Sequence, residues 1–370
     1  MRNTLKVGSD FSGVGAFNQA LIRLGVNYEE LFACDMDKYA RKVFIHNYGT
    51  ETDIEILKHP NVKFCDDIYY RLFIDLKSLR PTISEIKKLI TIQEETARLF
   101  SFYYPWNVKY RKISTEPLDI YMTSPPCQAF SLAGKRKGEE DKRGILFYNS
   151  HEFIRENKPR YFIFENVKGL LSDDGGKTFA RWIDYLGGKS VNGNPVIFPH
   201  EDSVPYHIYH KVLNAKNYGV PQNRERVFII GILDDADNNF SFPKEIPLTK
   251  RLKDVLEKNV DEKYFLSVRR LMTLENRNRS IGFTDPKKKY YSNCILSSYC
   301  KIPTDGEYLK FKNSIRRYTP RECFRLMDFP DSFDFSCVSD SQAYKQSGNS
   351  IVVNVLCEVL IKLLKIKKPR

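Results

Sequence analysis

Short apolar runs of strand length alternate with amphipathic helical periods over the first two-thirds of the chain. Residues 16–24 and 39–48 repeat apolar side chains at helical spacing, which predicts two helices. The apolar, β-branched and aromatic runs predict strands at residues 5–9, 30–34, 62–65, 119–122, 161–164 and 227–232. Because strands and helices alternate, we expect a mainly parallel sheet with helices on both of its faces.

Two segments interrupt this alternation. Residues 69–117 form a long insertion, in which the capping-box sequence Thr82-x-x-Glu85 predicts an amphipathic helix packed on the body. Beyond about residue 240 the alternation stops, and helical periodicity returns from Asn349. We therefore predict one domain of residues 1–242 plus 341–370, which contains the insertion, and a smaller second domain of residues 243–340.

The composition is that of a globular protein with a surplus of positive charge. The 370 residues suggest about two domains, and 42% hydrophobic with 28% charged residues exclude a disordered or fibrous chain. Lys and Arg number 59 against 46 Asp and Glu, a formal net charge of +13. This surplus favours a polyanionic partner such as nucleic acid, although a solvated basic surface explains it equally well.

Neither the termini nor the cysteines indicate a membrane protein, a secreted protein or a metal site. The N-terminus is polar, and charged side chains interrupt the most apolar stretch, residues 351–366. The eight cysteines include no Cys-x-x-Cys pair, so we expect free thiols in a reducing compartment. His207 and His210 lie in a predicted strand that puts them on opposite faces, and we predict no metal.

Candidate binding residues follow the first two strands, at the edge where ligands bind in sheets of this class. Phe11, Gly13 and Gly15 belong to a glycine turn that lets a ligand approach the backbone closely. Asp35 ends the second strand, where its carboxylate either accepts ribose hydroxyls or caps the next helix. Together these residues favour a nucleoside-type cofactor.

Reactive side chains follow the later strands. Cys127, held at the sheet edge by two prolines, is either a nucleophile or a buried structural thiol. Glu165 follows three apolar residues that could raise its pKa for proton transfer, or it caps the next element. Arg224 and Arg226 share a face if their segment is extended; they either orient a phosphate, base oxygen or carboxylate, or pair with Glu225.

As an ordered set, these motifs closely resemble those of the cytosine carbon-5 DNA methyltransferase family. The resemblance covers nearly the whole chain, apart from residues 69–117 and most of 245–310. It implies an α/β fold, with a Rossmann-like methyltransferase domain built on a mixed, mainly parallel sheet and a smaller target-recognition domain. The matching stretches are Asp10–Gly15, Pro126-Cys127-Gln128, Glu165-Asn166-Val167, Gln222-x-Arg224-x-Arg226, Arg317–Glu322, Arg325–Pro330, Gln342–Gln346 and Gly348-Asn349-Ser350.

The resemblance implies methyl transfer from S-adenosyl-L-methionine to carbon 5 of a cytosine. The Cys127 thiolate would add to carbon 6 of the ring, and Glu165 would bind N3 and either protonate it or hydrogen-bond to it. Arg226 would reach the base oxygen O2, and Arg224 would support the base or the thiolate. The residues that would bind the cofactor are Phe11, Gly13, Gly15, Asp35, Met36, Asp67, Ile68, Pro125, Leu146, Asn349 and Ser350. Met36 departs from the aromatic residue that the family often has at this position.

The implied partner is double-stranded DNA, from which the target cytosine must be flipped out. Residues 129–144 carry three glycines and a basic run, which suits a lid over that base. We expect a monomer without membrane contact, in the bacterial cytoplasm at the nucleoid, or in the host cell for a phage or viral source. A restriction endonuclease would be a functional companion without forming a complex. Side chains expected to read neighbouring bases, within about residues 245–315, are Arg277, Asn278, Arg279, Ser292, Asn293, Ser297, Ser298 and Tyr299.

Three other functions compete with this interpretation. A carbon-5 cytosine methyltransferase acting on transfer RNA would share the chemistry, but the Cys-Phe-Thr marker of that branch is not evident here. An inactive DNA-binding homologue should lack Cys127 or Glu165, and this chain has both. A nicotinamide-dependent dehydrogenase would explain the sheet but leaves Cys127 and the paired arginines without a role.

Overall fold

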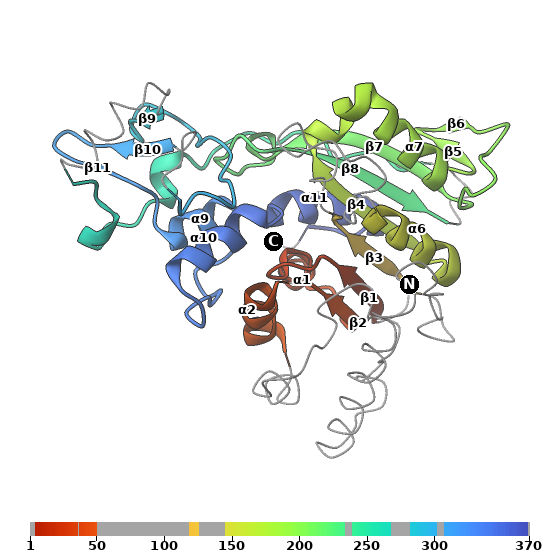
Figure 1. Cartoon of the computed structure of the whole chain (residues 1–370), viewed down its shortest axis with the longest axis horizontal. Coiled ribbons are helices and arrows are strands. Elements are labelled where there is room, and N and C mark those ends of the chain that lie inside the picture. The colour runs from red at the N-terminus through yellow and green to blue at the C-terminus, as the bar shows by residue number, and fades with distance from the viewer. Residues whose placement is uncertain are drawn as a thin grey trace, which may run out of the picture.

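A mixed β-sheet with helices on both faces forms the body of the protein (Figure 1). The computed structural model describes residues 4–35, 37–49, 118–125, 145–233, 239–267, 282–301 and 307–368. Over these residues the sheet has eight strands in the order β2-β1-β3-β4-β8-β7-β5-β6. They are β1 (Leu5–Asp10), β2 (Tyr28–Cys34), β3 (Ile120–Thr123), β4 (Tyr161–Val167), β5 (Ser190–Val191), β6 (Asn194–Pro195), β7 (His207–Asn214) and β8 (Glu225–Ile232).

The direction of the strands changes in the middle of the sheet. β1 runs parallel to β2 and β3, and β3 runs parallel to β4. β8 then runs antiparallel to both β4 and β7, so that Val167 at the end of β4 pairs with Arg226 near the start of β8. The mixed, mainly parallel sheet implied by the sequence motifs is confirmed.

Side chains of successive strand residues enter two separate hydrophobic layers, as the pleat of a strand requires. In β4, Ile163 packs in the layer that contains α1 and α11, while Phe162 and Phe164 pack in the layer that contains α6 and α7. Phe147 of α6 stacks on Trp182 of α7 with ring centroids 4.2 Å apart. The helices of the body are α1 (Ala16–Arg23), α2 (Lys38–Tyr48), α6 (Ile145–Asn157), α7 (Lys177–Leu186) and α11 (Val353–Leu364).

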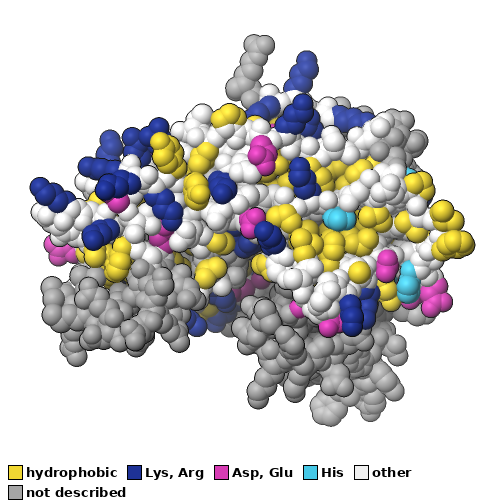
Figure 2. Space-filling model, turned by 90° about the horizontal axis from the view of Figure 1, so that it is seen from above, with side chains coloured by type: hydrophobic (Ala, Val, Ile, Leu, Met, Phe, Trp, Pro, Cys, Tyr) yellow, Lys and Arg dark blue, Asp and Glu magenta, His cyan; other side chains and the backbone are white. Residues whose placement is uncertain are grey.

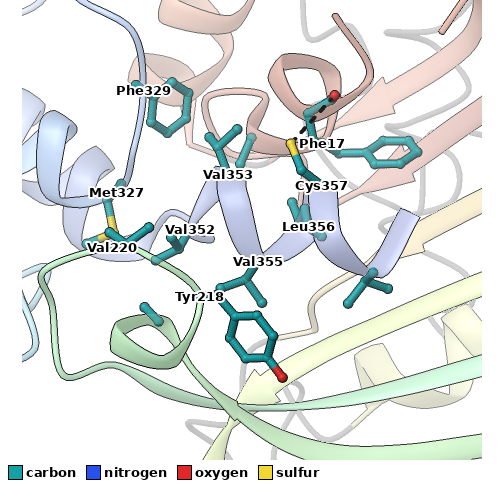
Figure 3. Close-up of a cluster of buried hydrophobic side chains, with 14 of the residues drawn as sticks. Phe17, Tyr218, Val220, Met327, Phe329, Val352, Val353, Val355, Leu356 and Cys357 are labelled. Atoms are coloured by element: carbon teal, nitrogen blue, oxygen red, sulfur yellow. Dashed lines mark hydrogen bonds between the residues drawn. The ribbon is translucent and has the colours of Figure 1, made fainter. Parts of the chain in front are cut away.

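The helix α11 lies at the centre of the larger hydrophobic layer (Figure 3). Its side chains pack against Phe17 of α1, against Tyr218 of the loop before β8, and against Met327, which belongs to the small lobe described next. The stretch Asp340–Leu364 is long and apolar enough to cross a membrane, yet 72% of its most apolar window is buried inside the protein. It also divides into two helices, α10 (Asp340–Asn349) and α11. This stretch is therefore part of the core of the fold.

A small lobe lies to the left of the body in Figure 1 and contains a second, three-stranded sheet. Glu307 is 3% exposed and accepts hydrogen bonds from the Lys289 ammonium, the Asn293 backbone N–H and the Tyr318 hydroxyl. The lobe shares one continuous hydrophobic cluster with the body, and the domain limits at residues 243 and 340 remain a prediction. Its elements are β9 (Gly282–Thr284), β10 (Glu307–Lys310), β11 (Ile315–Arg316) and α9 (Pro320–Leu326).

Every predicted strand and helix that falls on described residues is present. The predicted helices 16–24 and 39–48 correspond to α1 and α2, and the predicted strand 227–232 lies within β8. The predicted strand 62–65 and the insertion 69–117 lie outside the described residues.

A buried histidine of α6 lies in the aromatic layer of the core. His151 is 3% exposed, its ring lies 5.1 Å from that of Tyr185, and its Nε2 has no hydrogen-bond partner among the described residues. Burial, and to a lesser extent the neighbouring Arg155, lower the pKa of His151 to about 4. The folded protein therefore holds this ring neutral under conditions where an exposed histidine is protonated.

We expect this histidine to make the fold sensitive to mild acid. At pH values between the unfolded pKa of about 6.5 and the folded value, this histidine binds a proton in the unfolded chain but not in the folded chain. The free energy of unfolding therefore falls as the pH falls. The loss should be about 3 kcal/mol between pH 7 and pH 4. His151→Phe should remove that share of the pH dependence, measured by urea unfolding at several pH values. Equal pH dependence in both proteins would contradict this assignment.

Candidate active site

The carboxyl ends of four neighbouring strands meet at one edge of the sheet, and β8 begins at the same edge (Figure 1). Asp10 at the end of β1 pairs with Cys34 of β2 and with Thr123 of β3, and Thr123 pairs with Phe164 of β4. Segments that follow these strand ends are therefore close neighbours. All the candidate residues described below belong to this edge or to loops that pack on it.

The loop between β1 and α1 has an unusual backbone that leaves room for a ligand. Phe11, Gly13 and Gly15 have φ angles of 55°, 55° and 85°, and for Phe11 this left-handed conformation costs about 1 kcal/mol or more. The loop is held by Ser12, whose backbone N–H and hydroxyl both donate to the Cys34 carbonyl at 2.9 Å. A Cβ atom at Gly13 would meet no described atom within 4 Å, so its backbone is open to close approach.

Gly15 allows α2 to pack closely on this loop. A Cβ atom at this position would lie 2.3 Å from the Tyr48 ring and 3.1 Å from the Phe44 ring. The glycine is therefore needed because α2 packs directly on the loop. The expected close approach of a ligand to Gly15 stays a prediction.

Asp35 fixes the glycine loop and leaves the capping of α2 to another residue. Its carboxylate accepts hydrogen bonds from the backbone N–H groups of Gly13 (2.9 Å) and Asp37 (2.8 Å). Asp37 itself caps α2 through the Tyr39 N–H, which excludes the alternative that Asp35 is the N-cap. Burial raises the pKa of Asp35, while the two N–H donors act in the opposite direction. Each carboxylate oxygen has two lone pairs, so ribose hydroxyls could still be accepted.

Glu165 and Arg226 form a buried ion pair at the junction of β4 and β8. Arg226 Nε lies 3.1 Å from Glu165 Oε1, and Glu165 is 7% exposed. Burial raises the pKa of Glu165, and the nearby Arg226 and Arg224 counteract this shift. A raised pKa is the direction expected from the apolar residues that precede Glu165. It suits a carboxyl group that must hold and release a proton.

Asn166 ties the end of β4 to the segment that leads to the cysteine. Its Nδ2 donates to the Pro125 carbonyl at 2.8 Å, and its Oδ1 accepts from the Val167 N–H at 2.8 Å. Pro125 is buried beside Glu165 and Asn166 at this edge. Cys127 lies two residues further on, outside the described residues. The same holds for Met36, Asp67, Ile68 and the predicted lid.

Arg224 makes contacts that differ from those expected. It is 3% exposed, and its Nη1 donates to Cys294 Sγ (3.2 Å) and the Ile295 carbonyl (2.9 Å). Its Nη2 donates to the carbonyls of Gly348 (2.9 Å) and Ser350 (2.7 Å). These bonds join Arg224 to the small lobe and to the C-terminal end of α10 with its C-cap, which we call the Gly348–Ser350 turn. Both Nη groups of Arg224 are therefore engaged away from Glu165, whereas its Nε has no hydrogen-bond partner among the described residues. The charge of Arg224 still acts on the pKa of Glu165, and its support of the base or the thiolate stays a prediction.

The remaining cofactor candidates surround the same edge. Leu146 is buried at the start of α6, Ser350 is 6% exposed, and Asn349 is exposed. With the open backbone at Gly13 and the carboxylate of Asp35, they supply apolar, polar and acidic groups. This combination fits a nucleoside linked to an amino acid.

Sequence reasoning missed the roles of Gln222 and Asp37. Gln222 is fully buried, accepts from the Ile295 N–H (2.9 Å) and donates to the Leu326 carbonyl (2.7 Å), which joins body and small lobe. Asp37 accepts from the Lys345 ammonium at 2.7 Å and so joins α2 to α10. An aspartate directly before a helical period is a signal for the cap. No local signal exists for the long-range bonds of Gln222.

Two of the residues expected to read DNA bases are buried. Tyr299 is 5% exposed and its hydroxyl donates to the Glu307 carbonyl, and Ser292 is fully buried against Pro221. These two expectations are wrong, because both side chains serve the core of the small lobe. Asn293 and Ser298 are exposed and Ser297 is half-buried, while residues 277–279 lie outside the described residues.

The comparisons with known proteins agree on one protein family. The model of the C-5 cytosine-specific DNA methylase family matches residues 106–365. The chain is 30% identical to the Type II methyltransferase M.HhaI of Haemophilus parahaemolyticus, over 94% of this chain and 90% of that protein. It is 31% identical to M.HpaII of Haemophilus parainfluenzae, over 93% of this chain and 84% of that protein.

Solved structures show the same fold. The Dnmt2 methyltransferase of S. pombe superposes with a TM-score of 0.65 at 20% identity, covering 97% of this chain and 98% of that one. The methyltransferase EhMeth of Entamoeba histolytica gives 0.63 at 19% identity, with coverage of 98% and 99%. With the family match spanning most of the chain, this protein belongs to the C-5 cytosine-specific DNA methylases and is a DNA cytosine-5-methyltransferase.

Proposed function

We propose that this enzyme methylates carbon 5 of a cytosine that is flipped out of a specific duplex sequence, through a covalent adduct with Cys127. The observation that carries the proposal is the buried Glu165–Arg226 pair, 3.1 Å apart, at the sheet edge from which the chain runs on to Cys127. A proton-carrying acid and a fixed cation beside a nucleophile are what addition to a cytosine ring requires. A base inside the duplex stack could not reach these groups.

The protein side chains have to make an unreactive ring carbon nucleophilic. In the proposed reaction the Cys127 thiolate bonds to carbon 6 of cytosine, and Glu165 gives its proton to N3, which takes up the charge that the addition creates. Electron density then rises at carbon 5. After methyl transfer, a general base or water takes the proton from carbon 5, and the sulfur–carbon bond breaks, which restores the ring double bond and the Cys127 thiolate. N3 returns its proton to Glu165, so the acid is also restored.

Arg226 is suited to orient the base. Its guanidinium engages Glu165 through Nε and the Glu225 carbonyl through Nη1 at 2.8 Å. Because a guanidinium carries five N–H donors, it can also serve the base oxygen O2. Arg226 also limits the rise in the pKa of Glu165, so that the carboxyl can both give up and recover its proton.

We propose S-adenosyl-L-methionine as the cofactor. When bound, it supplies an activated methyl group to carbon 5. Asp35 would accept the ribose hydroxyls while holding Gly13 in place. Phe11, Leu146 and Pro125 would contact the apolar parts of the ligand, and the Asn349–Ser350 turn would close the site from the C-terminal side.

The proposed polymer substrate is duplex DNA. Lys and Arg side chains gather over the small lobe, on the left of Figure 2, which suits contact with phosphates. The M.HhaI and M.HpaII relatives are Type II methyltransferases, and a restriction endonuclease is the functional companion that this class suggests. Exposed lysines of this lobe are Lys253, Lys258, Lys287, Lys288, Lys301, Lys310 and Lys312.

Cys127→Ser should abolish methyl transfer from tritiated S-adenosylmethionine to duplex DNA, because a hydroxyl is a far weaker nucleophile at neutral pH. DNA containing 5-fluorocytosine should trap the intact enzyme as a covalent adduct, since the fluorine cannot leave as a proton. Cys300→Ser in the small lobe is the matched control and should keep activity. The mechanism is wrong if the intact enzyme forms no adduct, and the substrate is wrong if transfer RNA is methylated in place of DNA.

Two isosteric substitutions separate cofactor binding from base chemistry. Asp35→Asn should weaken S-adenosylmethionine binding about tenfold, because a charge-assisted hydrogen bond is worth about 1.5 kcal/mol. Glu165→Gln should leave that affinity unchanged and slow methyl transfer about 100-fold or more, since the amide cannot donate a carboxyl proton. Calorimetric titration and single-turnover rates measure both effects. Similar affinity losses in the two variants would mean that one carboxylate is misplaced.

Target choice should reside in residues 245–315, which contain no family motif. Neighbouring bases are read in the major groove, where a good contact discriminates by about 1–3 kcal/mol. Grafting this segment into M.HhaI should transfer the target of the present enzyme, read by bisulfite sequencing of methylated plasmid. An active chimera with the original target would place specificity elsewhere, with the 69–117 insertion as the next candidate.

A further inference from the structure

The residue directly before β8 is a second arginine, Arg224, whose hydrogen bonds the proposed chemistry does not use. Arg224 is 97% buried, and burial lowers its pKa only to about 10, so the guanidinium stays charged at neutral pH. All the hydrogen bonds of its side chain with described residues go to two segments that are more than fifty positions apart in the chain. One segment is residues 292–297 of the small lobe, and the other is the Gly348–Ser350 turn.

The two segments also touch each other directly. A Cβ atom at Gly348 would lie 2.3 Å from both the Leu296 carbonyl carbon and the Ser297 nitrogen. The small-lobe backbone therefore rests on the turn with no space for even a methyl group. Displacement of either segment would move the other or break its bond to Arg224.

The body anchors the small-lobe segment from its other side. Asn223 and Ser292 are joined by a backbone hydrogen bond of 2.8 Å, and the Ser292 N–H donates to the Pro221 carbonyl at 2.9 Å. Gln222 holds the Ile295 N–H at 2.9 Å. The segment that precedes Arg226 thus pairs with residues 292–295 while its arginine reaches across to the turn.

We propose that Arg224 is a positioning residue that couples cofactor binding to DNA binding. This inference rests on the proposed function, in which the Asn349–Ser350 turn contacts S-adenosylmethionine and target choice lies within residues 245–315, which include the exposed Asn293 and Ser298. A ligand that orders the turn fixes the Gly348 and Ser350 carbonyls against the Arg224 guanidinium. The same guanidinium then holds the Ile295 carbonyl, and with it residues 292–297 of the small lobe. By linkage, DNA must favour cofactor binding by the same factor that the cofactor favours DNA binding.

The test compares the affinity for S-adenosylhomocysteine, measured by calorimetry, with and without a saturating duplex that carries the site found by bisulfite sequencing. The wild-type enzyme should bind the cofactor product at least about fivefold more tightly with the duplex, the low end of typical coupling. Arg224→Lys keeps the charge but not the fork of donors, and its ratio should fall to near 1. A purely structural role would lower the melting temperature and both affinities while keeping the ratio.

A matched control and a second variant make the test independent of folding defects. Arg160→Lys changes an exposed arginine that lies over the Tyr161 ring, at the opposite end of β4 from the site, and should keep the wild-type ratio. Gly348→Ala pushes the two segments apart without touching Arg224 and should also lower the ratio. If Arg224→Lys does not fold, Gly348→Ala decides.

Two results would overturn the inference. One is a wild-type ratio of 1, and the other is a wild-type ratio preserved in the folded variant. Failure of the proposed function looks different, because the wild-type enzyme would then bind no S-adenosylhomocysteine or methylate no duplex DNA.

Discussion

The reversed direction of β8 is the constraint on which the site depends. Because β8 runs antiparallel to β4, its first residues lie beside the last residues of β4, and Arg226 pairs with Val167 two positions beyond Glu165. In a parallel arrangement the carboxyl end of β8 would lie there instead, and the arginines would sit at the far edge of the sheet. The ion pair of Glu165 and Arg226, and the reach of Arg224 into the small lobe, both follow from this one reversal.

Much of the frame could be predicted because it depends on local pattern. Short runs such as 161–164 and 227–232 are apolar enough to be recognised as strands, and Gly13 and Asp35 follow strands at the edge where ligands bind. The spacing of the motifs identified the family. Periodicity carries no information on strand direction, however, so the reversal of β8 could be inferred only from resemblance and not from the residues themselves.

What could not be predicted depends on contacts between distant segments. Gly15 has the same local appearance as Gly13, yet it is required by the ring of Tyr48, which is thirty-three positions away in the chain. The Tyr299 side chain can form hydrogen bonds, as a base-reading residue must, but its hydroxyl bonds to the Glu307 carbonyl inside the small lobe. Arg224 and Arg226 are two positions apart with identical side chains, and the structure directs them to different tasks.

The different surroundings of these two arginines account for the different roles that we propose for them. Arg226 meets a carboxylate whose charge can change, so the pair can respond to a base that needs a proton. Arg224 donates hydrogen bonds to a thiol and three carbonyls, none of which is a carboxylate. Removing even one of these acceptors leaves a buried cation less well satisfied, which costs on the order of a few kcal/mol. The buried charge of Arg224 therefore holds residues 292–297 and the Gly348–Ser350 turn together.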